Sequence, residues 1–343
     1  MAWGVEPTRY SMSTSPASVV KPAAASDAHA LLDERVEQLL SRPQRTLGIT
    51  RFRERFIYAF LVSCGLLSLL VTVSIVLVLL GETWSFFADD QVTLSNFWGS
   101  TTWDPLLGKQ KSFGIWALIC GTAHVTVIAM LVAGPLGLIT AIYLSEYAPA
   151  RVRAVLKPIL EILAGIPTVI YGFFALIAIT PLLQKILPGV GVQNALSAGI
   201  AVGILCMPTI CSLAEDALRA VPRSLRDAAL GLGGTKFDVT VKVVLPAALS
   251  GIIAAFLLAI ARAIGETMIV ALAAGNLPQW TLDPRSNVQT MTGFMVQMVT
   301  GDVTNYGIEY RSMYAVAFTL FLITLLLTML GGWVRRRFRE VYE

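Results

Sequence analysis

Six long apolar segments separated by polar loops constrain this chain more than any other feature of its sequence. A bilayer core of about 30 Å needs about 20 apolar residues per helix, and only 14% of all residues are charged. The segments are continuous, whereas the strands of a membrane barrel alternate within about ten residues. We therefore predict an all-α integral membrane protein with six transmembrane helices. The segments lie at about 56–80, 114–144, 158–183, 192–214, 243–275 and 312–334.

Two of these segments, the second and the fifth, are longer than a bilayer is thick. They must therefore tilt, kink or project beyond the membrane. The second contains the run Gly134-Pro135-Leu136-Gly137. A proline inside a helix removes one backbone hydrogen bond and favours a kink, so we predict a kink at this point.

The regions on either side of the membrane domain, residues 56–335, differ from it in composition. Residues 1–55 are expected to form an N-terminal tail that is disordered where Ser, Ala and Pro dominate, and residues 336–343 a basic C-terminal tail. Residues 27–42 carry apolar side chains at helical spacing, which indicates a short amphipathic helix or a weakly helical tail. No apolar segment precedes Phe56, so we expect a retained first helix rather than a cleaved signal peptide.

The distribution of Lys and Arg predicts the orientation. Placing both termini in the cytoplasm leaves 20 of the 26 basic residues in cytoplasmic segments, five in outside loops and Arg262 inside the membrane. Cytoplasmic loops of membrane proteins carry an excess of basic residues, so we predict cytoplasmic N- and C-termini. The two long outside loops carry aromatic residues that suit either the headgroup interface or a landing surface for an extracytoplasmic protein: Trp84, Trp98, Trp103, Trp280, Tyr306 and Tyr310.

The four cysteines lie in apolar segments, and none has metal-ligand spacing to another cysteine or a histidine. We interpret them as small residues of membrane helices and expect no metal site. They are Cys64, Cys120, Cys206 and Cys211.

The loop between the fourth and fifth segments, at about 215–246, carries the most specific motif. It reads R-D-A-A-L-G-L-G-G-T-K-F-D-V-T-V-K-V-V-L-P from Arg226 to Pro246. The start is helical, glycines then permit a tight turn, and a second helix enters the membrane. This pattern resembles the EAA loop of ABC importer permeases, with Asp227 in place of the usual glutamate. The resemblance implies the type I permease fold and a coupling helix that docks on an ATPase subunit.

The residues that this resemblance assigns to ATPase coupling are Asp227, Ala228, Ala229, Gly231, Gly233 and Lys236. The chain has no G-x-x-x-x-G-K-[ST] motif to cradle the phosphates of ATP. We therefore expect no cofactor on this chain, and ATP hydrolysis by a separate subunit.

Two charged residues stand inside the fifth segment, in the stretch A-R-A-I-G-E-T-M. A charge near the bilayer centre costs roughly 2.5–3.5 kcal/mol on insertion scales, so it usually faces a cavity or a partner. Arg262 and Glu266 are four residues apart and would share one face of a continuous helix, with Thr267 next to them. They form either a self-neutralising structural pair or an anion site in a permeation pathway, where Arg suits an oxyanion and Glu266 could accept the proton of hydrogen phosphate.

Further stretches resemble the phosphate-importer permeases of the PstC/PstA family, over about residues 112–335. They are G-T-A-H-V-T from Gly121, A-I-Y-L-S-E-Y from Ala141, L-K-P-I-L-E-I-L-A-G-I-P-T-V-I-Y-G from Leu156, and R-A-I-G-E-T-M with A-A-G-N from Ala273. The last is closer to the PstC-type subunit. The resemblance implies a phosphate importer in the inner membrane of a bacterium, with a PstA-like second permease, two ATPase subunits and an extracytoplasmic phosphate-binding protein. No nucleic-acid partner is expected.

Several alternatives stay open at this point. A permease for another oxyanion, such as molybdate or sulfate, is the nearest one, and a membrane enzyme would need a cluster of titratable residues near one interface. A membrane-anchored signalling component would need a larger soluble domain. The lone intramembrane His124 fits a structural role or a place in the pathway, and Glu161, between two prolines, more often caps or snorkels than binds substrate.

Overall fold

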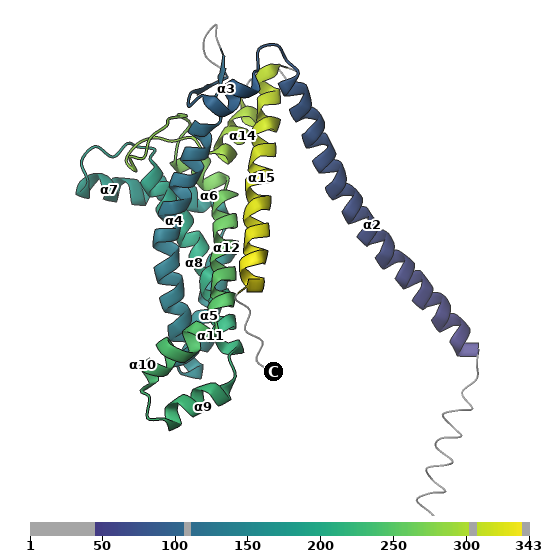
Figure 1. Cartoon of the computed structure of the whole chain (residues 1–343), viewed down its shortest axis with the longest axis vertical. Coiled ribbons are helices and arrows are strands. Elements are labelled where there is room, and N and C mark those ends of the chain that lie inside the picture. Colours follow the sequence, from purple (N-terminus) through teal and green to yellow (C-terminus); the bar gives the residue numbers. More distant parts are fainter. Residues whose placement is uncertain (1–44, 106–110, 302–306, 338–343) are drawn as a thin grey trace, which may run out of the picture. The chain divides into compact units, whose positions relative to one another are not determined.

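The computed structural model describes residues 45–105, 111–301 and 307–337 (Figure 1). The predicted amphipathic helix at 27–42 and residues 338–343 of the predicted C-terminal tail lie outside these ranges. The chain divides into two units, Met1–Val73 and Ser74–Glu343, and each is described by itself. The described part of the first unit is one continuous stretch of helix α2 (Arg45–Phe87), which begins before the predicted start of the first span.

The side chains of α2 in the first unit are exposed and mostly apolar from Phe56 onward, as lipid-facing residues of a spanning helix should be. The apolar character runs around the helix rather than along one stripe, which is typical of a helix in lipid. The helix continues to Phe87 in the second unit.

A bundle of four long helices forms the centre of the second unit. They are α4 (Trp116–Ile142), α8 (Ala195–Ala220), α12 (Leu249–Ile264) and α15 (Ile308–Arg337). Helix α8 packs between α4 and α12, and α15 packs against α12 (Figure 1). Small residues allow the close approach of α4 and α8: a Cβ on Gly199 would lie 2.5 Å from the Ile128 side chain. Helix α4 continues through Pro135 without interruption and ends in a π-helical turn, η1 (Tyr143–Tyr147).

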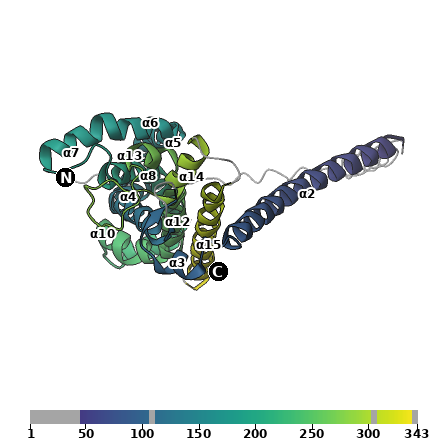
Figure 2. The same ribbon diagram turned by 90° about the horizontal axis from the view of Figure 1, so that it is seen from above.

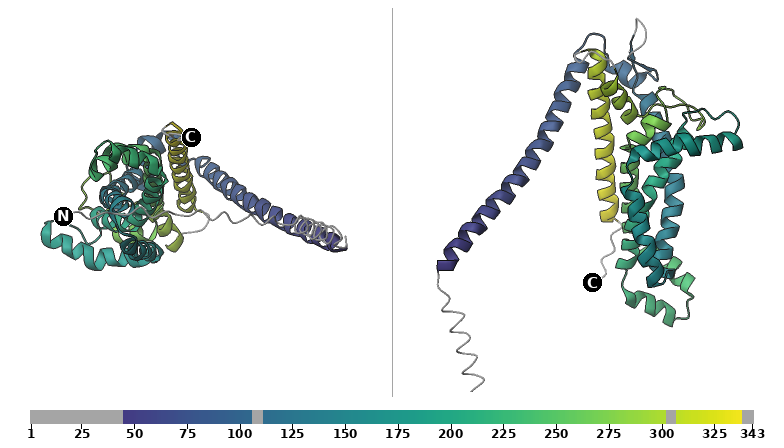
Figure 3. Two further views of the ribbon diagram at one scale, coloured as in Figure 1. Left: turned by 90° about the horizontal axis from the view of Figure 1, so that it is seen from below. Right: turned by 180° about the vertical axis from the view of Figure 1, so that it is seen from behind.

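The third apolar segment forms a helix, α5 (Ala150–Gly165), and after a break a continuous helical stretch, Thr168–Ile186, that is long and apolar enough to cross a membrane. The stretch consists of α6 (Thr168–Phe174), the π-helical turn η2 (Ala175–Ile179) and α7 (Thr180–Ile186). A break at Ile166 and Pro167 separates α5 from α6, because a residue before proline avoids the helical region. These elements lie along one side of the bundle (Figure 2), and α7 runs crosswise to the long helices (Figure 3).

One end of the bundle carries a small cap with an aromatic core. The cap consists of α3 (Leu94–Gly99) and the antiparallel pair β1 (Trp103–Asp104) and β2 (Ser112–Phe113). Trp103 is only 2% exposed and packs edge-on against Phe113 and Phe294. The prediction that Trp103 serves the headgroup interface or a landing surface is therefore wrong. Its ring fills the cap, whereas Trp84, 78% exposed, remains at the surface.

The opposite end of the bundle carries a pair of short helices, α9 (Arg223–Gly231) and α10 (Lys236–Val239) (Figure 1). The π-helical turn η3 (Thr240–Val244) and α11 (Leu245–Ala247) lead from α10 into α12. Among the described residues, five helices are long and apolar enough to cross a membrane, and a sixth crossing results when the segments Lys236–Ala247 and Leu249–Ile264, bent by 68°, count as one span. This agrees with the six predicted spans.

Candidate translocation and coupling sites

The first candidate site lies where the fifth apolar segment breaks. Helix α12 ends at Ile264, Gly265 follows as its C-cap, and a six-residue helix α13 (Met268–Ala273) begins three residues later. The assumption that Arg262 and Glu266 lie on one continuous helix is therefore wrong. Residues four apart face each other only within one helix. Because the break separates Arg262 from Glu266, the two residues do not share one helix face.

Glu266 lies inside this break and stabilises the start of α13. Its Oε1 accepts hydrogen bonds from the backbone N–H groups of Met268, at 3.2 Å, and Ile269, at 3.3 Å. Its own carbonyl accepts a hydrogen bond of 2.6 Å from the hydroxyl of Thr292, near the start of α14 (Met291–Thr300). The first N–H groups of a helix have no partner within the helix, so the buried carboxylate satisfies two of them. Its negative charge also interacts favourably with the positive, N-terminal end of the helix dipole.

Arg262 has a different partner from the one predicted. Its Nη1 donates a hydrogen bond of 2.9 Å to the hydroxyl of Thr209 on α8. Among the ion pairs of the described residues, none joins Arg262 to Glu266. The hypothesis of a self-neutralising pair is therefore wrong, because each charge is held by neutral polar groups of a different element.

The structure places Thr267, the third predicted pathway residue, and two residues whose roles the sequence left open, His124 and Glu161, as follows. Thr267 follows Glu266 in the break, and its hydroxyl donates to the carbonyl of Gly265 at 3.2 Å. His124 is half-buried on α4, and its buried Nδ1 has no hydrogen-bond partner among the described residues. Glu161 is exposed on α5. These placements leave the roles of all three residues as hypotheses.

The second candidate site is the α9–α10 pair, where the sequence predicts a helix, a tight turn and a second helix. Asp227, Ala228 and Ala229 lie on α9, and Gly231 is its last residue. Gly233 has a φ of +86°, a conformation that side chains with a Cβ disfavour, and it turns the chain toward α10. Thr235 then caps α10 by accepting a hydrogen bond from the N–H of Asp238 at 3.2 Å.

Lys236 does not extend away from the pair, because its ammonium group lies 5.0 Å from the centre of the Tyr147 ring in η1. Such a cation–π contact stabilises an exposed cation by about 0.5–1 kcal/mol. It ties the start of α10 to the end of α4.

Two apolar side chains at the tip of the pair were missed in the sequence. Leu232, the C-cap of α9, is 91% exposed, and Phe237 on α10 is 68% exposed. An exposed apolar patch rimmed by polar residues marks an interaction surface, and these two side chains are candidates for such a patch. Both residues are visible in the sequence as large apolar residues between two spans, but a turn between two helices does not show from sequence which of its side chains face outward.

The pair is anchored to the bundle by one arginine. Arg226 on α9 donates hydrogen bonds to the carbonyls of Leu218, at 2.7 Å, and Val221, at 2.6 Å, at the end of α8. It also pairs with the Glu146 carboxylate of η1 at 3.1 Å. Unpaired carbonyls at a helix C-terminus favour a cation there, so Arg226 connects α9 to both α4 and α8.

A bundle of spanning helices with a projecting, anchored helix pair is the architecture of the membrane subunit of an ABC transporter. A solved bacterial ABC transporter involved in the import of the acidic polysaccharide alginate shares the fold, with a TM-score of 0.59 at 13% identity over 84% of this chain and 97% of that chain. The chain belongs to the family of binding-protein-dependent transport system inner membrane components, whose model matches residues 133–340 and so includes both candidate sites.

Curated relatives make the similarity more specific. The chain is 30% identical to the probable ABC transporter permease YqgH of Bacillus subtilis, over 88% of this chain and 96% of that protein. It is 33% identical to the phosphate transport system permease PstC of Mesorhizobium japonicum, over 77% of this chain and 86% of that protein. A probable phosphate permease PstC of Methanocaldococcus jannaschii is 31% identical to this chain, over 67% of this chain and 78% of that protein. The resemblance to the phosphate permeases is confirmed.

Proposed function

We propose that this chain is the permease subunit of an ATP-driven importer of inorganic phosphate. The observation that carries the proposal is the similarity to PstC phosphate permeases, which spans 77% of the chain for the Mesorhizobium protein. Because the family model covers residues 133–340, the broken span and the helix pair both belong to the shared part. The chain would pass phosphate through without altering it chemically, so it would not itself be an enzyme.

The charge distribution supports an orientation with both termini in the cytoplasm of a bacterium and the α9–α10 pair on the cytoplasmic side of the inner membrane. In this orientation the exposed tip at Leu232 and Phe237 faces an ATPase subunit. The complete importer would contain a second, PstA-like permease, two ATPase subunits and an extracytoplasmic phosphate-binding protein. ATP would bind to the ATPase subunits, since this chain lacks a phosphate-cradling loop.

A continuous series of contacts supports coupling between the two sites. Movement of α9 is transmitted by Arg226 to the end of α8. Helix α8 carries Thr209, which holds Arg262 at the end of α12. A displacement of α9 by the ATPase therefore acts on α8, and α8 acts on the side chain next to the break. Such a series transmits motion when its elements have two discrete arrangements.

The chemistry at the break suits hydrogen phosphate. Arg262 supplies planar N–H donors that match a tetrahedral oxyanion. Glu266 uses Oε1 for the cap of α13, and in the described part of the structure no hydrogen bond engages its Oε2. That oxygen can accept the proton that hydrogen phosphate carries and sulfate lacks at neutral pH. Thr267 adds a hydroxyl beside them.

The test measures uptake of radiolabelled phosphate in cells that depend on this importer, with sulfate and molybdate as competitors. Arg262→Gln should reduce phosphate uptake at least tenfold, because it removes the positive charge. Glu266→Gln keeps a carbonyl acceptor for the α13 cap and removes only the charge, so it should impair uptake while the protein still assembles. Thr209→Val leaves both charges and removes the hydroxyl that positions Arg262, so it separates the effect of the charge from the effect of its position.

Full phosphate uptake by both charge variants would exclude the pathway role of these residues. Molybdate or sulfate competing as well as phosphate itself would show that the substrate is another oxyanion. Copurification with an ATPase that is lost when Leu232 and Phe237 are both changed to Ser tests the coupling surface, because those substitutions remove its exposed apolar area.

A further inference from the structure

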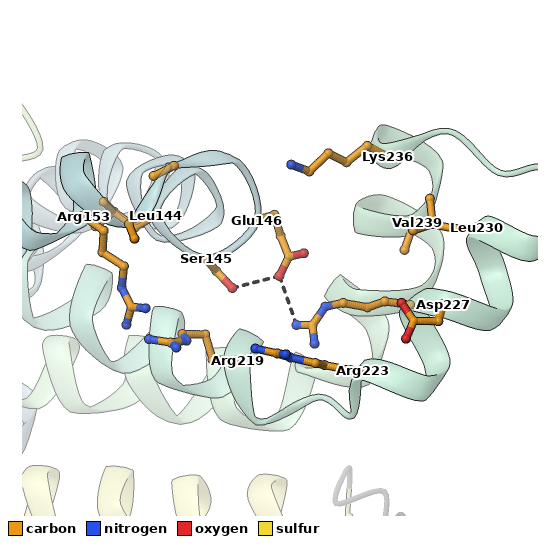
Figure 4. A pocket seen from close by; sticks show the side chains of 13 residues that line it. Leu144, Ser145, Glu146, Arg153, Arg219, Arg223, Asp227, Leu230, Lys236 and Val239 are labelled. Atoms are coloured by element: carbon orange, nitrogen blue, oxygen red, sulfur yellow. Dashed lines mark hydrogen bonds and ion pairs between the residues drawn. The ribbon is translucent and has the colours of Figure 1, made fainter.

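A cavity of about 450 Å³ lies between the α9–α10 pair and the ends of three bundle elements (Figure 4). The end of α4 with η1, the start of α5 and the end of α8 form its other walls. The charged side chains that line it are five cations and two acids: Arg153, Arg219, Arg223, Arg226, Lys236, Glu146 and Asp227. The transport pathway proposed above does not use this cavity.

Some of these cations already have partners. Arg226 is satisfied by Glu146 and by two backbone carbonyls. Lys236 lies over the Tyr147 ring. The Arg153 guanidinium is 2.6 Å from the Glu215 carboxylate, which is 1% exposed. Substituting Arg153 or Arg226 would therefore disturb the fold around the cavity.

Arg219 and Arg223 are the cations that the protein itself neutralises least. Arg219 is 3.9 Å from Glu215, a carboxylate that Arg153 and Lys157 share. Arg223 is exposed on the first turn of α9 and takes part in none of the ion pairs found among the described residues. The guanidinium groups of Arg153, Arg219 and Arg223 follow one another along one wall (Figure 4).

The charges around the cavity do not balance. With the ion-pair partners Lys157, Glu215 and Asp216 included, six cationic and four acidic side chains lie in and around it, an excess of two positive charges. This count includes the Asp227 carboxylate on the cavity lining, which repels a bound anion. A dianion would neutralise the excess, and guanidinium groups bind phosphate oxygens through parallel N–H bonds.

We propose that this cavity binds a phosphate group. The group belongs either to free hydrogen phosphate or to the headgroup of an anionic phospholipid, because both present the same oxygens to Arg219 and Arg223. A cavity of this volume holds either one together with water. A bound phosphate contacts α9 through Arg223, α8 through Arg219 and α5 through Arg153, so it restrains the helix pair against the bundle.

A consequence follows for regulation, and only this consequence rests on the proposed function. In the proposed orientation the cavity faces the cytoplasm, where imported phosphate accumulates. Phosphate bound there would hold α9 in place and slow coupling, which is inhibition by the product. The binding site itself does not depend on which solute the permease transports.

The experiment uses the assembled transporter, purified with its ATPase and second permease, in nanodiscs of phosphatidylcholine. Equilibrium dialysis measures binding of radiolabelled inorganic phosphate without ATP or binding protein. The double variant Arg219→Gln/Arg223→Gln is compared with Arg151→Gln/Lys185→Gln, which removes the same charge from exposed positions that do not line the cavity. Because the double variant and the control share every phosphate site outside the cavity, the difference between them reports binding in the cavity. A second arm uses nanodiscs with phosphatidylglycerol and counts, by mass spectrometry, the anionic lipid retained after delipidation.

We expect the double variant to bind phosphate at least tenfold more weakly than the control, or to retain one phosphatidylglycerol fewer per permease. The first result identifies free phosphate as the ligand and the second identifies a lipid headgroup.

Equal phosphate binding and equal lipid retention by the two variants would overturn the proposal. Loss of the ATPase subunits from the double variant alone, on size-exclusion chromatography, would overturn it too, because the arginines would then be part of the docking surface. If transport proves specific for another oxyanion while the dialysis difference persists, the proposed function fails and this site remains.

Discussion

Two buried glutamates, one near the end of α8 and one at the break in the fifth span, are held in opposite ways. Glu215 near the end of α8 is 1% exposed and lies between three cations, Arg153 at 2.6 Å, Lys157 at 3.6 Å and Arg219 at 3.9 Å. The Arg153 contact to Oε1 lies outside hydrogen-bond geometry, so attraction between charges holds it. Glu266 is 8% exposed, and among the described residues the hydrogen bonds that its carboxylate accepts come from backbone N–H groups.

The difference separates a joint, meaning a carboxylate that holds two helices together, from a carboxylate whose partners lie next to it in the chain. A buried charge requires compensation, and at Glu215 the compensation comes from α5 and from α8 itself, so the carboxylate locks these two helices together. At Glu266 the compensation is local, within three residues along the chain. The Glu266 carboxylate therefore stays compensated when the break changes position relative to other helices.

The largest expected effect tests the joint at Glu215. Glu215→Ala leaves three cations without their shared partner, and breaking a buried ion pair by removing one side is strongly destabilising. We expect the free energy of unfolding to fall by about 3 kcal/mol. The measurement is unfolding of the purified permease by dodecyl sulfate in mixed micelles, followed by circular dichroism.

Asp216→Asn is the matched control, because Asp216 is the neighbouring acid, also pairs with Lys157, and has a side chain that is 62% exposed. Exposed pairs contribute little, so this variant should lose less than about 1 kcal/mol. Combining Glu215→Gln with Arg153→Gln removes one charge of each sign and should recover part of the loss. If Glu215→Ala and Asp216→Asn unfold alike, the ionic joint does not exist.

The next effect in size concerns Glu266. Glu266→Ala removes the acceptor from the start of α13, and losing such a cap costs about 1–2 kcal/mol. Glu266→Gln keeps an oxygen acceptor and should lose less than half of that. The same unfolding measurement distinguishes the two variants. If glutamine destabilises as much as alanine, then the charge and not the cap holds this glutamate, and the contrast with Glu215 disappears.

The two glutamates also show how far the sequence could predict this structure. The six spans were predictable, because an apolar run of about 20 residues has few other stable conformations. The break at Gly265 was not, since glycine is tolerated inside membrane helices and the interruption depends on Thr292, which is 26 residues further along the chain and donates to the Glu266 carbonyl.

The ion pairs of Glu215 could not be predicted for a related reason. Its main partners, Arg153 and Lys157, lie about sixty residues earlier on α5, and the sequence shows them only as basic residues that predict orientation. The EAA-like motif was recognisable because its spacing is local. Its outward-facing tip at Leu232 and Phe237 was not, because the direction of each side chain depends on the turn at Gly233.

The turn at Gly233 extends the comparison to a site held by backbone geometry alone. Gly233→Ala forces a Cβ into the left-handed region at a φ of +86°, which costs about 1 kcal/mol, and we expect weaker stimulation of ATP hydrolysis in the assembled transporter. Gly231→Ala is the control, since Gly231 is helical and an added Cβ meets nothing within 4 Å. Equal ATPase rates in the two variants would show that the conformation of this turn does not matter for coupling.

The smallest effect is expected at Asp283, an acid held by charge as Glu215 is, but at the surface. In the loop before α14, the Arg285 guanidinium donates to both Asp283 carboxylate oxygens, at 3.0 and 3.1 Å, and these hydrogen bonds lower the pKa of Asp283 below its usual value. A lowered pKa in the folded protein means that the pair stabilises above the pKa of the unfolded state, near 4, and that this contribution is lost as the pH falls through the folded pKa. The melting temperature of wild type should therefore exceed that of Asp283→Asn slightly and equally at pH 5 and pH 7, and the two should converge below about pH 4. A difference between the two proteins that grows from pH 7 to pH 5 would mean that another group, such as the nearby His124, controls this loop.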